Sequence, residues 1–281
     1  MARIARLHPM QVLLASLLAL AAVGSARAQQ ATMDAAAAEM GQAISHAKAK
    51  TVVVFDFAGP GEKVTAMGEK LADDFAAALA KSGGKFQVED RSHIVESFRE
   101  NDFAPGAVQD PDMAFWLTKE LGDEALVWGN LSQEGDEIQI ALNSYRVDKQ
   151  KKIGSFEIRL PITDEMKVLI NKNLNDDLWP NLAEAGKNGY SIPSCLQCPY
   201  APFSDEAVRR KRGGTVSLLV IVGENGQAKD IKVLKAVPYG LTRSAVEAVR
   251  SWEFKPATDP TGKPSEVKQL VEASFNLYRG P

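Results

Sequence analysis

Residues 213–226 read Gly213-Gly214-Thr215-Val216-Ser217-Leu218-Leu219-Val220-Ile221-Val222-Gly223-Glu224-Asn225-Gly226. Aliphatic side chains occupy every second position, which predicts a strand with one face in a core. The stretch ends in Asn225-Gly226, the pair that two-residue hairpin turns favour. Residues 228–236 are therefore expected to return as a second, antiparallel strand.

A helix and a third strand complete this unit. Apolar residues recur at helical spacing at Leu241, Ala245, Ala248, Val249 and Trp252, which predicts a helix that covers the sheet. The last strand alternates, with one face formed by Val267, Val271, Ala273, Phe275 and Leu277. We expect this strand to be an edge, with five residues on its exposed face: Lys268, Leu270, Glu272, Ser274 and Asn276.

These motifs closely resemble the C-terminal domain of the TonB energy-transducer family. The resemblance rests on residues 199–203, the strand start at 213–216, the 223–226 turn, and a Trp-x-Phe-x-Pro-Ala signature that begins at Trp252. It continues through Gly262-Lys263-Pro264 to Phe275. The resemblance implies a three-stranded antiparallel sheet packed by helices.

The resemblance also implies a function. A partner peptide, such as the plug segment of an outer-membrane TonB-dependent receptor, would add to the sheet edge by β-augmentation. The chain would then support energy-coupled transport across the outer membrane, with inner-membrane motor proteins as further partners and a homodimer as another option. The alternative is a non-transducing envelope scaffold or adaptor, whose charged edge is simply solvated.

The first half of the chain predicts a separate unit. Residues 51–57 form a continuous apolar run, typical of a strand buried on both faces of a sheet. Helices, a short strand at 86–89 and three strand-like runs between 124 and 161 follow, giving a β-α-β-α-α order and then a β-meander. With its Val52-Val53-Val54-Phe55-Asp56-Phe57 start, this unit resembles the CsgG, FlgO and TolB N-terminal type of envelope domain.

The expected fold class is therefore α+β, in two domains. We predict a signal peptide at 1–28, a leader helix at 29–50, and the envelope domain at 51–162. A helical linker and a Cys-x-x-Cys junction at 163–198 lead to the TonB-like domain at 199–281. A folded domain thus stands where a typical TonB protein has a proline-rich spacer, which leaves coupling to the motor open.

The N-terminus predicts export. Arg3 and Arg6 precede an apolar run of about 15 residues, and small residues flank Arg27 before a cut after Ala28. Removing this leader lowers the basic residues from 33 to 30 against 36 acidic ones, which argues against a nucleic-acid binder. We expect a periplasmic protein, with an uncleaved inner-membrane anchor as the alternative.

The two cysteines, Cys195 and Cys198, are expected to form a disulfide, as cysteines in oxidising compartments usually do. A redox-active pair or a metal site are the alternatives, although structural zinc needs four ligands. The sequence contains no other group of residues arranged for catalysis. We therefore expect no enzyme activity, no cofactor and no metal.

Overall fold

The computed structural model describes residues 29–59, 63–108 and 111–277. The expected signal peptide and its cleavage site at Ala28 lie outside these residues. Residues 29–46 are helical, and the elements that follow are β1 (Thr51–Val54), α2 (Ala66–Lys81), β2 (Gln87–Val88), α3 (Arg91–Glu100), α4 (Pro111–Glu120), β3 (Ala125–Glu134), β4 (Glu137–Arg146), β5 (Lys151–Pro161), α5 (Asp164–Asn171), η2 (Leu174–Asp177), β6 (Ser194–Gln197), α6 (Asp205–Arg210), β7 (Gly214–Val222), β8 (Ala228–Lys235), α7 (Leu241–Arg250), β9 (Glu253–Lys255), β10 (Ala257–Thr258), β11 (Pro264–Ser265) and β12 (Val267–Phe275). The predicted α+β class, with a β-α-β-α-α start and a β-meander, is confirmed.

The first sheet has five strands in the order β2-β1-β3-β4-β5. The strand β1 runs parallel to β2 and β3, whereas β3, β4 and β5 form an antiparallel meander. Helices cover both faces. Val52 and Val54 pack with α2 and the 29–46 helix, while Val53 and Phe55 pack with α3 and α4. This double cover explains why residues 51–57 are almost continuously apolar.

The helix at 29–46 is part of this core. Its Met33, Ala37, Met40 and Ile44 are at most 2% exposed and belong to the same apolar cluster as Leu71 of α2. The spacing of these residues, one turn apart, places them on a single face. The helix at 29–46 is therefore a layer of the first domain. The sequence predicted the helix but not that it packs into the core.

A buried carboxyl group lies just before β3. Asp123 is 6% exposed, and its Oδ2 has no hydrogen-bond partner within the described residues. Burial raises the pKa of Asp123 to about 6, against an opposing hydrogen bond from Thr51 and with help from the negative charge of Glu89. The folded chain thus binds this proton more tightly than the unfolded chain does.

Asp123 is expected to make the protein less stable as pH rises. Because its folded pKa lies above its unfolded value, stability falls between about pH 4 and pH 6 and stays level above that. Asp123→Asn should raise the unfolding free energy at pH 7.5 by about 1–2 kcal/mol, and the gain should vanish near pH 4. Urea unfolding at both pH values measures this. A gain of equal size at pH 4 and pH 7.5 would contradict a role for the charge.

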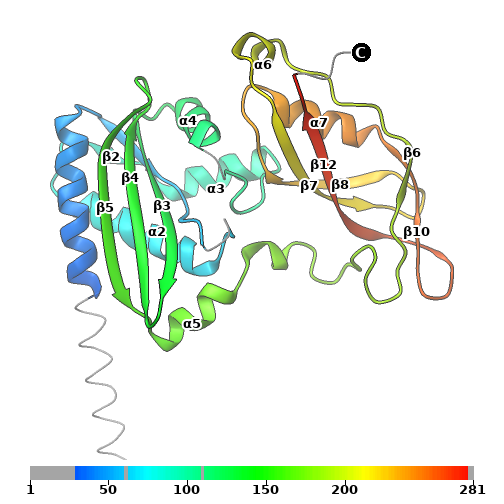
Figure 1. Cartoon of the computed structure of the whole chain (residues 1–281), viewed down its shortest axis with the longest axis horizontal. Helices are drawn as coiled ribbons and strands as arrows, with labels where there is room; N and C mark the ends of the chain where they lie inside the picture. Colours follow the sequence, from blue (N-terminus) through cyan, green and yellow to red (C-terminus); the bar gives the residue numbers. More distant parts are fainter. Residues whose placement is uncertain (1–28, 60–62, 109–110, 278–281) are drawn as a thin grey trace, which may run out of the picture.

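The linker contains less helix than the sequence predicted. α5 ends at Asn171, a 3-10 turn follows at Leu174–Asp177, and residues 178–193 contain no further helix. The cause is a tertiary contact, because the carbonyl of Lys172 accepts a hydrogen bond from the N–H of Ala66 at 2.9 Å. That pairing holds the chain extended just where the helix would have continued. Figure 1 shows the linker passing from α5 to the C-terminal half.

The second sheet is antiparallel, with three strands in the order β12-β7-β8. Its inner face packs against α7 through Leu241, Ala245 and Val249. Two short two-stranded sheets, β6-β9 and β10-β11, lie beside it. No helix in the described part of the chain is long and apolar enough to cross a membrane.

The two halves share one apolar core. A single cluster of buried side chains joins Phe55, Ile94 and Met113 of the first half to Val220 and Val233 of the second. Figure 1 shows α3 and α4 lying between the two sheets. The first domain is therefore packed against the second rather than tethered to it by the linker alone.

Candidate functional site

The strand β12 is an edge of the second sheet, as the sequence predicts. It pairs with β7 along its whole length, from Val267 opposite Val222 to Phe275 opposite Gly214. Among the residues that the structure describes, no other strand pairs with its outer side. An edge strand presents unpaired N–H and C=O groups that can accept another strand.

The orientation of these groups follows from one contact. The N–H and C=O of Lys268 point away from β7, because both bond to the linker. Peptide groups alternate in direction along a strand, so those of Leu270, Glu272 and Ser274 point outward as well. None of the three has a backbone partner on that side within the described residues. They form a row of free donors and acceptors, which we call the open edge.

The predicted partner-binding residues lie close to the expected positions. Lys268, Leu270, Glu272 and Ser274 share the outer face of β12, where Leu270 is 56% exposed. Ser274 hydrogen-bonds across to Thr215, with 3.0 Å between the two hydroxyl oxygens. Asn276 is not on the strand, because β12 ends at Phe275.

Lys268 differs from the other three because it is already engaged. Its side chain donates to the carbonyl of Leu178 at 3.1 Å, and its backbone bonds to Ala183 and Ala185. The strand β12 is thus open only beyond this residue. The sequence offered no signal for this contact, since the linker segment has no strand-like alternation.

The opposite edge of the sheet, along β8, is covered by the first domain. The segment after α3 lies parallel to β8, with Phe103 opposite Val233. The N–H of Val233 donates to the carbonyl of Asp102 at 2.8 Å, and the N–H of Ala104 donates to the carbonyl of Val233 at 2.9 Å. We call residues 102–104 the strap. The strap therefore pairs with β8 at Val233, whereas β12 keeps a run of three outward residues without a backbone partner among the described residues.

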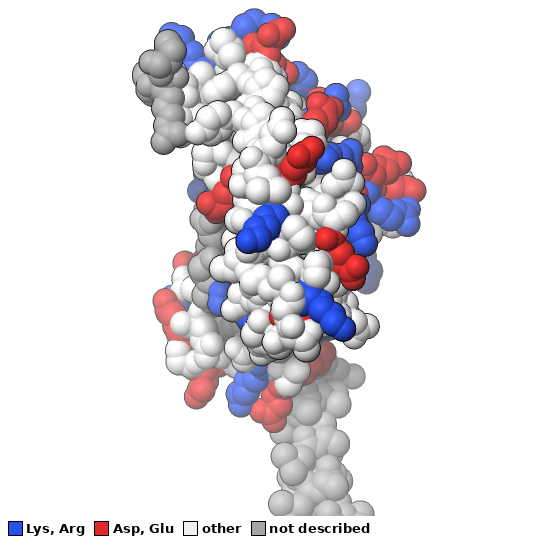
Figure 2. All heavy atoms as spheres, turned by 90° about the vertical axis from the view of Figure 1, so that its right-hand side faces the viewer, with Lys and Arg blue, Asp and Glu red and all other residues white. Residues whose placement is uncertain are grey.

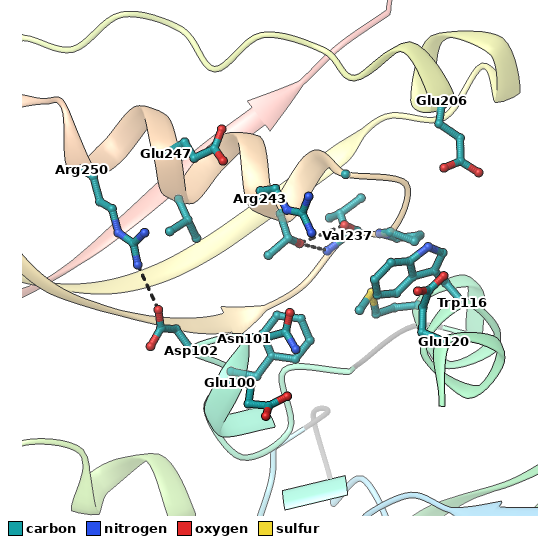
Figure 3. A pocket seen from close by; sticks show the side chains of 16 residues that line it. Glu100, Asn101, Asp102, Trp116, Glu120, Glu206, Val237, Arg243, Glu247 and Arg250 are labelled. Carbon is teal, nitrogen blue, oxygen red and sulfur yellow. Dashed lines mark hydrogen bonds and ion pairs between the residues drawn. The ribbon is translucent and has the colours of Figure 1, made fainter. Parts of the chain in front are cut away.

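Ion pairs reinforce the strap. Asp102 accepts from Lys232 at 3.2 Å and from Arg250 at 3.0 Å, so one carboxylate joins the strap to β8 and α7. The pair with Arg250 is visible in Figure 3, at one end of a cleft of about 470 Å³ between the two halves. Trp116 and Glu120 of α4 line its other end (Figure 3). The cleft thus marks where the domain interface is not fully closed.

The cysteines belong to the second half of the chain. Cys195 and Cys198 form a disulfide, which confirms the predicted pairing. Cys195 lies in β6 opposite Phe254 of β9, so the pair is attached to the C-terminal half of the chain and not to the linker. Beside it, the indole of Trp252 donates to the carbonyl of Pro199 at 3.0 Å. The disulfide therefore closes a short ring at the end of β6, while the pairing of β6 with β9 and the bond from Trp252 hold this segment beside the end of α7.

The rest of the described surface shows no assembled metal site. No group of three or more histidine, cysteine, aspartate or glutamate side chains is placed to hold a metal among the described residues. On the side of the C-terminal half shown in Figure 2, basic and acidic residues are interspersed among uncharged ones. That face therefore presents no continuous basic surface of the kind that binds nucleic acid.

The comparison with known families agrees with this geometry. Residues 199–277 match the family model described as Gram-negative bacterial TonB protein C-terminal. The C-terminal unit is TonB-like. The matched range begins at Pro199, next to Cys198, and includes β7, β8 and all of β12. It confirms the resemblance inferred from the sequence. We call this unit the TonB-like domain.

Several solved structures are also similar to parts of the chain. The C-terminal domain of LpoB from Escherichia coli is 14% identical, with a TM-score of 0.37, covering 46% of this chain and 98% of that one. The Pseudomonas aeruginosa TonB C-terminal domain is 22% identical, with a TM-score of 0.28, covering 36% and 98%. TolB from Acinetobacter baumannii is 10% identical, with a TM-score of 0.26, covering 66% and 38%. No curated protein sequence matches the chain.

Proposed function

We propose that this chain is a periplasmic protein whose TonB-like domain binds an extended segment of an outer-membrane receptor and supports energy-coupled transport. The observation that carries the proposal is the open edge, where Leu270, Glu272 and Ser274 direct free peptide groups outward on a TonB-like sheet. Adding a strand there would satisfy these groups by β-augmentation. The proposed role is binding and transmission of force, with no catalytic step and no cofactor.

A second candidate is a non-transducing envelope scaffold or adaptor. The observation that favours it is the shared core, because the first domain is fixed to the TonB-like domain through the strap and the apolar cluster. Two rigidly joined domains suit the assembly of two partners at a fixed spacing. Cross-linking in intact envelopes separates the candidates: a transducer should capture both a receptor and inner-membrane motor proteins, whereas a scaffold should capture no motor protein.

The open edge is tested by proline at Glu272. The backbone N–H of Glu272 points outward, so Glu272→Pro removes a donor from the open edge without breaking a bond to β7. Proline also favours an extended Val271, which the strand already has. We expect affinity for a receptor plug peptide to fall at least tenfold in isothermal titration, because the bonds beside the proline are lost with the donor.

Glu272→Ala is the matched control, since it removes the carboxylate but keeps the N–H. It should bind the plug peptide within about threefold of the wild-type affinity, as expected for loss of one exposed charge. Circular dichroism should show the same fold for all three proteins. Equal binding by Glu272→Pro and the wild type would exclude β-augmentation at this edge.

A further inference from the structure

The outer side of β12, next to the open edge, is paired with a segment of the chain itself. Residues 183–185 lie parallel to the first part of β12, with Glu184 opposite Lys268. The N–H of Lys268 donates to the carbonyl of Ala183 at 2.8 Å, and the N–H of Ala185 donates to the carbonyl of Lys268 at 3.0 Å. These are the bonds that an added partner strand would make. The linker therefore already occupies the first pairing position.

The linker leaves β12 immediately after this contact. Gly186 has a φ of +78°, a left-handed conformation that glycine tolerates best, and the N–H of Lys187 bonds back to the carbonyl of Glu184 at 3.1 Å. This turn directs the chain away from the sheet. The free length of β12 then runs from Leu270 to Ser274, about 13 Å at the usual rise of a strand. A partner strand of about five residues fills it.

The outer face of β12 is apolar at the Leu270 end of this length and negatively charged at Glu272. Leu270 lies opposite Leu219 of β7, and both are at least partly exposed, which makes an apolar patch beside the linker. Glu272 lies opposite Ser217, is exposed, and has no ion-pair partner within the described residues. Side chains two residues apart on an added strand would lie beside these two positions.

We propose that the open edge selects an extended segment of about five residues with an apolar side chain beside Leu270 and a lysine or arginine beside Glu272. The two side chains are two residues apart in the partner, and the 183–185 segment stops the partner strand before it reaches Lys268. This proposal rests on the proposed function, since it names the partner sequence that β-augmentation at β12 takes. The physical basis is apolar contact at one position and an opposite-charge cross-strand pair at the next.

The preference for a basic side chain beside Glu272 is tested by exchanging charges in the peptide and in the protein. Four synthetic peptides carry Leu-x-Lys, Lys-x-Leu, Leu-x-Glu or Glu-x-Leu in an otherwise identical extended sequence, which covers both strand directions. We expect the full chain to bind the better lysine peptide about threefold to tenfold more tightly than its glutamate counterpart, less so at high salt. Glu272→Lys should reverse the preference. An unchanged preference in Glu272→Lys would overturn the assignment of the charged position.

Weakening the pairing between residues 183–185 and Lys268 tests whether this segment limits the length of the partner strand. Ala185→Pro removes the N–H that bonds to Lys268, and it favours the extended Glu184 that the strand pairing already contains. Lengthening the peptide by two residues toward Lys268 should not change wild-type affinity. In Ala185→Pro, the longer peptide should bind about fivefold more tightly. Lys268→Met, which loses the contact to Leu178, provides a second variant with the same expectation.

The possible failures are distinguishable. If Glu272→Pro binds every peptide as the wild type does, the proposed function fails. If Glu272→Pro abolishes binding but the lysine and glutamate peptides bind equally, then only the sequence preference is wrong. If peptide length has the same effect in the wild type and in both linker variants, then the 183–185 segment does not limit the partner strand.

Discussion

Gly226→Ala is expected to destabilise the TonB-like domain by about 3 kcal/mol. Gly226 has a φ of +77°, where alanine is strained, and an added Cβ would lie 1.9 Å from the carbonyl oxygen of Phe254. That oxygen belongs to the backbone and cannot move aside alone. The shift would also disturb the 2.8 Å hydrogen bond from the N–H of Phe254 to Gly226. Strain, clash and a weakened bond therefore act together.

The same turn provides a matched control. An added Cβ at Gly223 would meet only side-chain atoms, the end of Lys229 at 2.7 Å and the Oδ1 of Asn225 at 2.9 Å, and side chains can move aside more easily than the backbone. Gly223→Ala should therefore cost less than about 1 kcal/mol. Urea unfolding followed by tryptophan fluorescence compares the two variants. Equal losses would mean that the approach of Phe254 to the turn is not what requires glycine at position 226.

This turn illustrates what sequence reasoning could predict. The Asn225-Gly226 pair and the alternating aliphatic residues of 216–222 are local signals that predicted the hairpin, although the N–H of Gly226 bonds to the carbonyl of Gly223, so Gly226 follows the two central residues of the turn instead of being one of them. The edge strand and four of its outward residues followed from the same alternation. Asn276 was assigned wrongly because alternation does not show where pairing ends, and β12 loses its partner after Phe275 opposite Gly214.

The contacts between segments far apart in the chain could not be predicted this way. Phe103 and Ala104 have no strand-like pattern, and they pair with Val233 because the packing of α3 against the second sheet brings them there. The 183–185 segment has equally weak signals. In both cases a short piece of backbone completes a sheet edge through its peptide groups, which every sequence carries. The pairing is therefore visible only once the domains are placed together.

Phe103→Ala is expected to weaken the connection between the two domains more than any surface change. Phe103 is 9% exposed, lies in the shared core, and packs edge-to-face on Phe98 with ring centroids 5.7 Å apart. Truncating a buried phenylalanine typically costs 3–5 kcal/mol, and we expect about 3 kcal/mol here because the site lies at an interface that can partly close. Val95 of the preceding helix α3 is 64% exposed, so Val95→Ala should change stability by less than about 0.5 kcal/mol.

The consequence for cooperativity distinguishes this variant from an ordinary core mutation. Since one apolar cluster spans both domains, the wild type should unfold in a single calorimetric transition. Phe103→Ala removes the apolar anchor of the strap but leaves the rest of each domain's core in place, so two transitions should separate. The open edge of β12 lies on the opposite side of the sheet, so peptide affinity should stay within about twofold. A single transition at lower temperature would mean that the rest of the shared core still couples the two domains, and that the strap adds stability without being required for that coupling.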